Sequence, residues 1–216
     1  ADLARRAPLD RPRLEALVRS GACDAFGRRR ALLWELGLVF FPQTVRGEAK
    51  QLTLALEPAN ETPELRDLTA WERMLADYRQ TGMSVGVHPL GLLRSHLPAG
   101  TLSSAELRER PHGSQVAVAG MAIARQRPST AKGIVFMLLE DEHGQVNLIL
   151  PSQVYEAHRA IVRGESLLLA RGRYERVGEN RNVLVASLES LAPLARRVAA
   201  GDVSGALPRA HHFGSR

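Results

Sequence analysis

The second half of the chain alternates short apolar runs with turn-forming residues. Five runs rich in Val, Ile, Leu and Ala are separated by polar turns and, between the third and the fourth, by a segment with helical spacing. Runs of this length and composition predict β-strands. The expected strands are Gln115–Ala124, Gly133–Leu139, Gln145–Leu150, Ser166–Arg176 and Asn182–Leu191, and the expected helix opens at Pro151 and Ser152 and ends at Gly164.

The order of these elements is β-β-β-α-β-β, which is the order of an OB-fold. An OB-fold is a five-stranded Greek-key barrel that binds oligonucleotides or oligosaccharides. We therefore predict an α+β protein, with a helical N-terminal half followed by an OB-fold β-barrel over residues 111–193.

Helical periodicity dominates the chain before the barrel. Asp10 and Pro12 open one helix that Gly21 ends, and a second helix is expected over Arg28–Leu36 with Gly37 at its end. The run Arg28-Arg29-Arg30 places cations at a helix N-terminus, where they oppose the helix dipole. The run is therefore either a solvated cap or a contact to phosphate.

Two pairs with capping-box spacing begin further helices: Thr69 with Glu72, and Ser103 with Glu106. The first of these helices should bury a stripe that starts at Trp71. The predicted organisation is a helical region over 1–45, a linker over 46–68, a helical connector over 69–110, the barrel over 111–193 and a basic tail over 194–216. His88 precedes a helix-opening proline without a second ligand nearby, which favours a structural histidine over a metal ligand or an acid–base group.

Composition adds a basic balance to this picture. The net charge is +6, and only two of the 29 basic residues are Lys. Arg offers a planar bidentate donor set that suits phosphates and bases, although a GC-rich coding sequence also produces Arg. Residues 1–50 carry about +4 and residues 194–216 about +3, whereas the barrel carries about +1. Basic flanks favour a nucleic-acid partner.

The cysteine count and the lengths of the apolar runs indicate the cellular compartment in which we expect the protein. The single cysteine, Cys23, excludes an internal disulfide and a Cys-based zinc site. No apolar run approaches the roughly 20 residues of a membrane helix, and the first residues show no export signal. We expect a cytoplasmic protein cut from a longer chain.

A short peptide in the expected linker has a possible partner of its own. Gln51-Leu52-Thr53-Leu54-Ala55-Leu56 resembles the linear motif with which bacterial polymerases and repair proteins bind the sliding clamp. The Leu side chains would enter an apolar groove while the Gln amide satisfies polar groups at its rim. The usual final aromatic residue is absent, and a chance match or a buried edge strand stays open. The clamp-binding candidates are Gln51, Leu52, Leu54 and Leu56.

Several blocks together resemble the bacterial C-family DNA polymerases. Leu14–Asp24 is similar to the helix that follows their helix-hairpin-helix element, and Glu72–Pro89 is similar to the block ahead of their OB domain. Gln126–Gly144 is similar to the first hairpin of that domain. Ala124–Pro128 and the short stretch after Pro193 resemble the error-prone, translesion branch, so the chain is expected to be its C-terminal region.

The resemblance implies a parent enzyme that is a DNA-directed DNA polymerase, a nucleotidyltransferase of DNA repair, translesion synthesis and damage-induced mutagenesis. Such polymerases hold Mg²⁺ with an Asp-x-Asp pair and a third Asp in their palm. This sequence has no Asp-x-Asp, so we expect no catalytic residue and no cofactor in this part. Glu140-Asp141-Glu142 is interpreted as a solvated hairpin turn. The expected partners are single-stranded or primer-template DNA and, through accessory contacts, the sliding clamp and translesion proteins.

OB-folds bind single strands across strands 2 and 3, helped by the loops between strands 1–2 and 4–5. The cations on these loops and on the fourth strand are the nucleic-acid-binding candidates: Arg125, Arg127, Lys132, Arg171, Arg173, Arg176 and Arg181. Phe136 lies in a run that is apolar on both faces, so we expect it in the core rather than against a base. Binding should then be salt-sensitive and weakly sequence-specific.

Two other classes of function compete with this one. The barrel can be a protein-interaction module in which the Arg contacts are incidental. An RNA-binding OB domain of the tRNA synthetase type is a further class, but the helical blocks before the barrel do not fit it.

Overall fold

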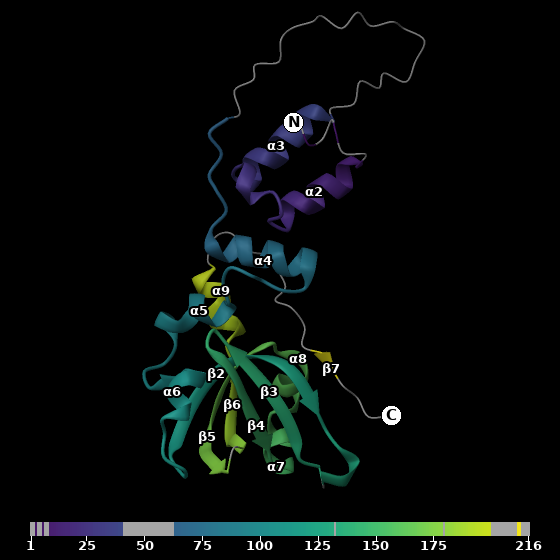
Figure 1. Ribbon diagram of the computed structural model, residues 1–216. Helices are drawn as coiled ribbons and strands as arrows, with labels where there is room; N and C mark the ends of the chain where they lie inside the picture. Colours follow the sequence, from purple (N-terminus) through teal and green to yellow (C-terminus); the bar gives the residue numbers. More distant parts are fainter. Residues whose placement is uncertain are drawn as a thin grey trace, which may run out of the picture. The chain divides into compact units, whose positions relative to one another are not determined.

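The computed structural model describes residues 3, 6, 9–40, 63–131, 133–178, 180–199 and 211–212. The chain divides into two compact units, one of 1–69 with 76–83 and one of 70–75 with 84–216. Figure 1 shows the helices of the first unit and the barrel of the second.

The first unit contains helices α2 (Arg11–Arg19) and α3 (Arg29–Val39), joined through the 3-10 turn η1 (Asp24–Phe26). Asp10 caps α2 by accepting a hydrogen bond from the Arg13 backbone N–H, as its position predicts. An apolar cluster of Leu14, Val18, Cys23 and Leu36 joins the helices. Helix α3 runs through Gly37 to Val39, so the prediction that Gly37 ends it is wrong.

Arg29 ties the first unit together from a buried position, 5% exposed. Its Nε donates to Asp24 Oδ1 at 2.8 Å, and its Nη1 donates to Asp77 Oδ1 at 2.6 Å and to the Arg19 carbonyl at 3.0 Å. The two carboxylates raise the pKa of the Arg29 guanidinium, chiefly through Asp24. The interpretation of the arginine run as a solvated cap is therefore wrong for Arg29, which forms a buried ion pair.

Helix α4 (Ala70–Thr81) begins directly after Thr69 and buries Trp71, Met74 and Leu75, as the helical stripe predicts. The second unit then adds short helices: α5 (Pro89–Leu93), continued by the 3-10 turn η2 (Arg94–His96), and α6 (Ser104–Arg108). The capping box of Ser103 and Glu106 at the start of α6 is confirmed, with both reciprocal hydrogen bonds present.

The barrel has the predicted α+β order. Its strands are β2 (Gln115–Gln126), β3 (Val135–Asp141), β4 (Gly144–Leu150), β5 (Leu167–Val177) and β6 (Asn180–Ser190), with α7 (Ser152–Ala157) and α8 (Arg159–Gly164) between β4 and β5. Neighbouring strands pair in the order β2-β3-β4-β6-β5, and β5 pairs back onto β2 to close the barrel. All pairs are antiparallel except β4 with β6. The OB-fold prediction is confirmed.

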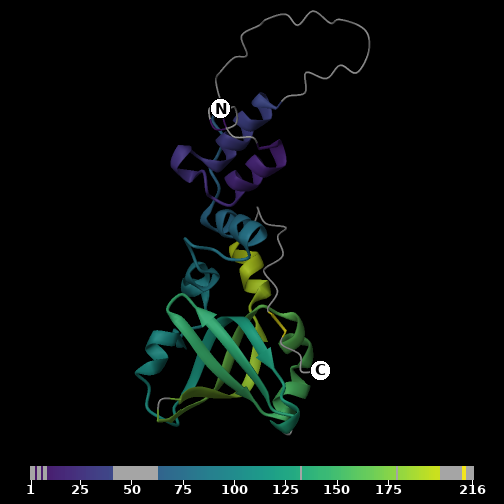
Figure 2. The ribbon, with the colours of Figure 1, turned by 45° about the vertical axis from the view of Figure 1, so that its right-hand side comes forward.

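Strand β2 closes the barrel because it is long enough to pair with two strands in succession. Its first part, to Met121, pairs with β5, and the part from Met121 onward pairs with β3, with a register shift between Ala122 and Ala124. Gly172 on β5 allows a close approach of backbones, since a Cβ there would clash with the Leu184 carbonyl on β6. Figure 2 shows the strands curving into a barrel.

The core of the barrel is apolar and includes residues from the helices. Leu148, Leu168 and Val183 from the strands and Tyr155 and Val162 from α7 and α8 belong to one buried cluster. The expected helix over 151–164 is divided at His158, between α7 and α8.

Three short elements extend the unit beyond the predicted barrel. Strand β1 (Thr101–Leu102) pairs in parallel with the first part of β2. Helix α9 (Ala192–Val198) follows β6. Strand β7 (His211–His212) pairs in parallel with Ala124 and Arg125 of β2.

Candidate nucleic-acid interface

The cations predicted to bind nucleic acid do not form one cluster. Arg125, at the end of β2, is only 7% exposed and its guanidinium donates to the carbonyl of Glu165, which follows α8. Burial lowers the pKa of Arg125. Arg125 therefore presents little of its guanidinium to solvent, which its position in the sequence did not reveal.

Arg127 in the loop after β2 is exposed. Its Nη2 lies 3.5 Å from Glu156 Oε1, and its guanidinium carbon lies 4.7 Å from the centroid of the Tyr155 ring. Lys132, from the same loop, lies outside the described residues.

Arg171 and Arg173 share the outer face of β5, as strand alternation predicts. Each is paired with a carboxylate: Arg171 with Glu189 on β6, and Arg173 with Glu175 at 2.8 Å on its own strand. The neighbours of β5 are β2 and β6, so these two side chains are not on the β3 and β4 strands that the OB-fold uses for binding.

Arg176 and Arg181 are register partners at the turn between β5 and β6. The backbone N–H of Arg176 donates to His112 Nδ1 at 3.0 Å. Arg181 directly precedes Asn182, and its Nε is buried without a hydrogen-bond partner in the described part of the chain. Of the two, only Arg181 is on a strand, β6, that also contributes a residue to the groove described next.

A shallow groove of about 390 Å³ crosses the outside of β2, β3, β4 and β6. The side chains and backbone that line it are those of Ala124, Gln126, Phe136, Met137, Leu138, Asn147, Leu148 and Asn182. We call this the groove face. Strands β2, β3 and β4 are successive neighbours in the sheet, and Figure 1 labels each of them on the barrel.

The strand register arranges the outward side chains of the groove face in two rows. One row crosses from Ala124 on β2 through Leu138 and Asn147 to Asn182 on β6. The other row crosses from Gln126 through Phe136 and Ile149 to Leu184, in the same strand order. Residues directly opposite one another on paired strands lie in contact distance, so the rows form a continuous surface.

Phe136 is 39% exposed on this surface. The expectation that it lies in the core is wrong. Strand β3 buries Val135, Met137 and Leu139 on its inner side and turns Phe136 and Leu138 outward. Because the outward residues are apolar as well, the sequence of this strand does not alternate and gives no sign of which face is inside.

All of the residues that line the groove have uncharged side chains. They combine one exposed aromatic ring, aliphatic neighbours and the amides of Gln126, Asn147 and Asn182. Tyr174, the other aromatic residue within the barrel strands, is fully buried. The face therefore offers a stacking surface with hydrogen-bonding groups beside it.

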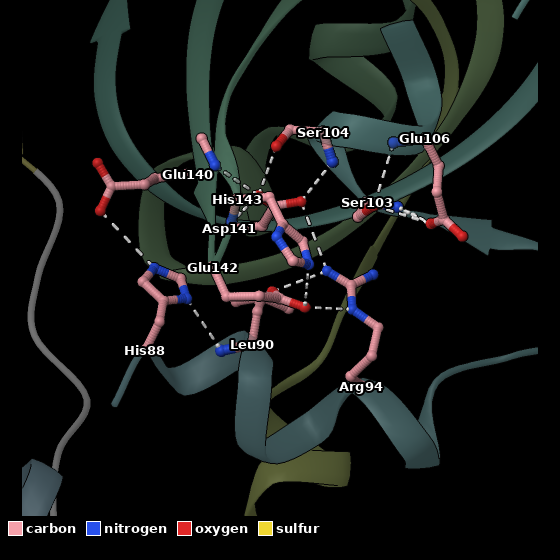
Figure 3. A network of polar contacts seen from close by, with 11 residues as sticks. His88, Leu90, Arg94, Ser103, Ser104, Glu106, Glu140, Asp141, Glu142 and His143 are labelled. Carbon is pink, nitrogen blue, oxygen red and sulfur yellow. Dashed lines mark hydrogen bonds and ion pairs between the residues drawn. The ribbon is translucent and has the colours of Figure 1, made fainter. Parts of the chain in front are cut away.

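A buried polar network fixes the turn of the β3–β4 hairpin, which carries Phe136 and Asn147 (Figure 3). Asp141, 5% exposed, accepts hydrogen bonds from Ser104 N at 2.5 Å, Ser104 Oγ at 2.7 Å, His143 N at 2.9 Å and Gly144 N at 3.0 Å. Burial raises the pKa of Asp141, but these hydrogen bonds together outweigh it and hold the pKa below its ordinary range.

Arg94 links the same turn to the helices that precede the barrel. Its Nε and Nη2 donate to the two carboxylate oxygens of Glu142 at 2.6 and 2.8 Å, and its Nη2 lies 3.4 Å from Asp141 Oδ2. Figure 3 shows Arg94 reaching from η2 toward the turn. Glu140-Asp141-Glu142 is thus not the solvated turn expected from the sequence, because Asp141 and Glu142 are held by these contacts.

His88 acts as the N-cap of α5. Its Nδ1 accepts a hydrogen bond from the Leu90 backbone N–H at 3.1 Å, and its Nε2 lies 3.7 Å from Glu140 Oε1. Burial lowers the pKa of His88, although the neighbouring carboxylates act in the opposite direction. This geometry agrees with the interpretation of His88 as a structural histidine.

The described residues contain no group of three or more His, Cys, Asp or Glu side chains that could hold a metal ion. The acid cluster of the hairpin does not fit Mg²⁺, since the oxygens of Asp141 and Glu142 are occupied by hydrogen bonds and by Arg94. In that part of the chain, no helix is both long and apolar enough to span a membrane. The peptide Gln51–Leu56 lies outside the residues that the structure describes.

Comparison with known proteins identifies relatives along almost the whole chain. The error-prone DNA polymerase of Anaeromyxobacter sp. (strain K) is 41% identical over 203 residues, or 93% of this chain. The error-prone DNA polymerase of Xanthomonas campestris pv. campestris (strain B100) is 40% identical over 195 residues, or 89% of this chain. The chain is homologous to part of the error-prone DNA polymerases. The resemblance to their branch is confirmed.

The chain spans 17% of the length of each of these error-prone DNA polymerases. No family model matches it. Among solved structures, asparaginyl-tRNA synthetase from Pyrococcus horikoshii aligns with 47% of this chain and 27% of its own at 18% identity and a TM-score of 0.35. A putative aspartyl-tRNA synthetase from Leishmania major Friedlin aligns with 44% and 21% at 13% identity and a TM-score of 0.37. TM-scores this low support no inference about the function of this chain.

Proposed function

We propose that this chain is the part of an error-prone DNA polymerase that holds single-stranded DNA on the groove face of its barrel. The observation that carries the proposal is the exposed ring of Phe136, which lies among aliphatic and amide side chains on the outside of β2, β3, β4 and β6. The names of the homologues make DNA the expected ligand.

The groove face suits an unpaired strand for a physical reason. A base that stacks on an aromatic ring contributes about 1–3 kcal/mol to binding, and it can do so only when it is not stacked within a duplex. Leu138 and Ile149 extend the apolar surface on either side of Phe136. Arg127 directly follows Gln126, and Arg181 directly precedes Asn182, so both cations are next in sequence to residues that line the groove. Arg125 is as close in sequence but is buried.

In the whole polymerase this surface would guide the single-stranded template during translesion synthesis and damage-induced mutagenesis. The nucleotidyl transfer and its Mg²⁺ ions would belong to a palm in the rest of the polymerase. Gln51–Leu56 would recruit the sliding clamp, with translesion accessory proteins as further partners, in the cytoplasm. The template role rests on the homology and on the groove face, whereas the other roles rest on the homology and on the sequence alone.

The proposal is tested by fluorescence anisotropy with a labelled single-stranded oligonucleotide. Phe136→Leu keeps an apolar side chain but removes the ring, and we expect it to weaken binding by about 1–2 kcal/mol. Phe26→Leu is the matched control, because Phe26 is 71% exposed and belongs to the other unit. Equal effects of the two substitutions, or no binding by the unsubstituted chain at low salt, would contradict the proposal.

A second candidate is a protein-docking surface with no functional nucleic-acid contact. The aliphatic side chains of Leu138, Ile149 and Leu184 on the same face favour it, since apolar surface is what protein interfaces bury at their centre. The same anisotropy experiment separates the two candidates. A protein-docking face predicts no DNA affinity and no difference between Phe136→Leu and Phe26→Leu.

A further inference from the structure

The hydrogen-bonding capacity of the groove face is concentrated in amides. Asn147 on β4 and Asn182 on β6 are register partners at one end of a row, and Gln126 on β2 lies opposite Phe136 in the other row. Gln126 therefore lies directly across from the aromatic ring on β2, whereas Asn147 and Asn182 lie on the other side of β3, in the neighbouring row. Each amide presents a donor and an acceptor side by side.

These amides are not committed to the protein. None of the three makes a side-chain hydrogen bond to another described residue. The outward cations of β5 differ, because Arg171 is paired with Glu189 and Arg173 with Glu175. On the groove face, the groups free to bind a ligand are thus neutral donor–acceptor pairs rather than charges.

From this arrangement we infer that the groove face is a base-selective site for an unpaired adenine, an inference that rests on the proposed function. An amide matches the N6 and N7 edge of adenine with two hydrogen bonds, whereas the same edge of guanine presents two acceptors. Adenine is therefore the base that an amide facing this edge selects. An adenine stacked on Phe136 would place this edge toward Asn147 and Asn182. Phosphates carry no sequence information and need cations, which the groove lining lacks.

The inference departs from the salt-sensitive, weakly sequence-specific binding that the sequence predicts. For single strands, the slope of log K against log salt is about −0.7 for each phosphate neutralised. With cations only near the ends of the groove, we expect a slope shallower than about −2. Arg127→Ala should make the slope shallower still, by about 0.7, without changing the base preference.

The experiment uses the full chain and four labelled oligonucleotides of about ten nucleotides. One contains only thymidine, and the others carry dA, dC or dG at the central position. Anisotropy titrations at four salt concentrations give both the base preference and the salt slope. We expect the dA oligonucleotide to bind at least about fivefold more tightly than the thymidine oligonucleotide.

The amides are then tested directly. Asn147→Ala combined with Asn182→Ala should reduce the preference for dA to less than about twofold and leave the salt slope unchanged. Gln145→Ala is the matched control, an exposed amide on the same strand that does not line the groove. It should keep the full preference, and thermal unfolding checks that all variants are folded.

The outcomes distinguish failure of the base-selective site from failure of the proposed DNA binding. Equal affinity for the four oligonucleotides, or a slope steeper than about −3, overturns the base-selective site while leaving DNA binding in place. A dA preference that survives loss of both asparagines also overturns it. Absence of binding to all four oligonucleotides overturns the proposed function itself.

Discussion

Strand β5 and the β3–β4 hairpin both present polar groups on the outside of the barrel, but they leave different groups free. On β5, the guanidinium groups of Arg171 and Arg173 face carboxylates on the barrel surface. On the hairpin, Phe136 and Asn147 face outward without a polar side-chain partner among the residues that the structure describes. The turn of the hairpin is held by buried Asp141.

The difference shows why charge alone locates a binding site poorly. An exposed ion pair contributes about 0–1 kcal/mol to stability, and each cation in it already has an anion beside it. An exposed aromatic ring next to free amides has no such partner, and its contacts remain available to a ligand. For this reason our proposed site lies on the hairpin and its neighbours rather than on β5.

The largest expected effect concerns stability. Asp141→Ala removes the acceptor for Ser104, His143 and Gly144 and leaves Arg94 with one carboxylate, so it should lower the free energy of unfolding by about 3–5 kcal/mol. Glu189→Ala removes an exposed partner on the β5 face and should cost less than about 1 kcal/mol. Urea unfolding followed by circular dichroism measures both values. Similar losses of unfolding free energy in the two variants would contradict the difference between the hairpin turn and the β5 face.

The next effect concerns DNA affinity. Phe136→Glu and Arg171→Gln each lower the net charge by one, so long-range electrostatics changes equally. The first also removes the stacking ring and should weaken single-strand binding by about 2–3 kcal/mol, whereas the second should change it by less than about 0.5 kcal/mol. Anisotropy titrations at one salt concentration are sufficient. A larger loss for Arg171→Gln would move the site to β5.

The smallest expected effect is a pH dependence of the free energy of unfolding, through His88 at the start of α5 and the carboxylates of the hairpin turn. Burial holds the pKa of His88 below its ordinary 6.5, so His88 contributes stability above pH 6.5 that is lost as the pH falls. Protonation of Nδ1 also removes the acceptor for Leu90 N–H. The pKa values of Asp141 and Glu142 are lowered too, so their contribution is complete above about pH 4.5 and is lost in more acidic solution.

Unfolding free energies measured from pH 8 to pH 5 should therefore decrease by about 1 kcal/mol or less through His88, the typical worth of a helix cap. His88→Asn keeps a capping side chain that does not titrate, and it should remove this decrease. Glu140, Glu142, Asp141 and Arg94 also face this region, and the substitution leaves them unchanged. A decrease of the same size in His88→Asn would show that another group is responsible.

The parts of the fold that depend on local sequence could be predicted. Turn residues and apolar runs gave the strand order of the barrel, and Ser103 with Glu106 gave the start of α6. Gly37 was misleading, because a glycine in the middle of a helix lowers stability by only about 1 kcal/mol and packing can offset it. Helix α3 accordingly continues beyond it.

The candidate site and the buried ion pairs were harder to predict because their partners are distant in the sequence. Asp141 binds Ser104 across 37 positions, and Arg29 binds Asp77 across 48 positions. Neither pairing has a local signal, so both groups of charges appeared solvated. Phe136 was assigned to the core because β3 is apolar on both faces, and only the closure of the barrel decides which face is inside.

The most direct test of the groove face is a nuclear magnetic resonance titration of the ¹⁵N-labelled chain with a single-stranded oligonucleotide. Binding at the groove face predicts that the backbone amide signals of Phe136, Asn147 and Asn182 shift as the DNA is added. The signals of Arg171 and Arg173 should stay in place. Shifts concentrated at Arg171 and Arg173, or no shifts at saturating DNA, would contradict the account.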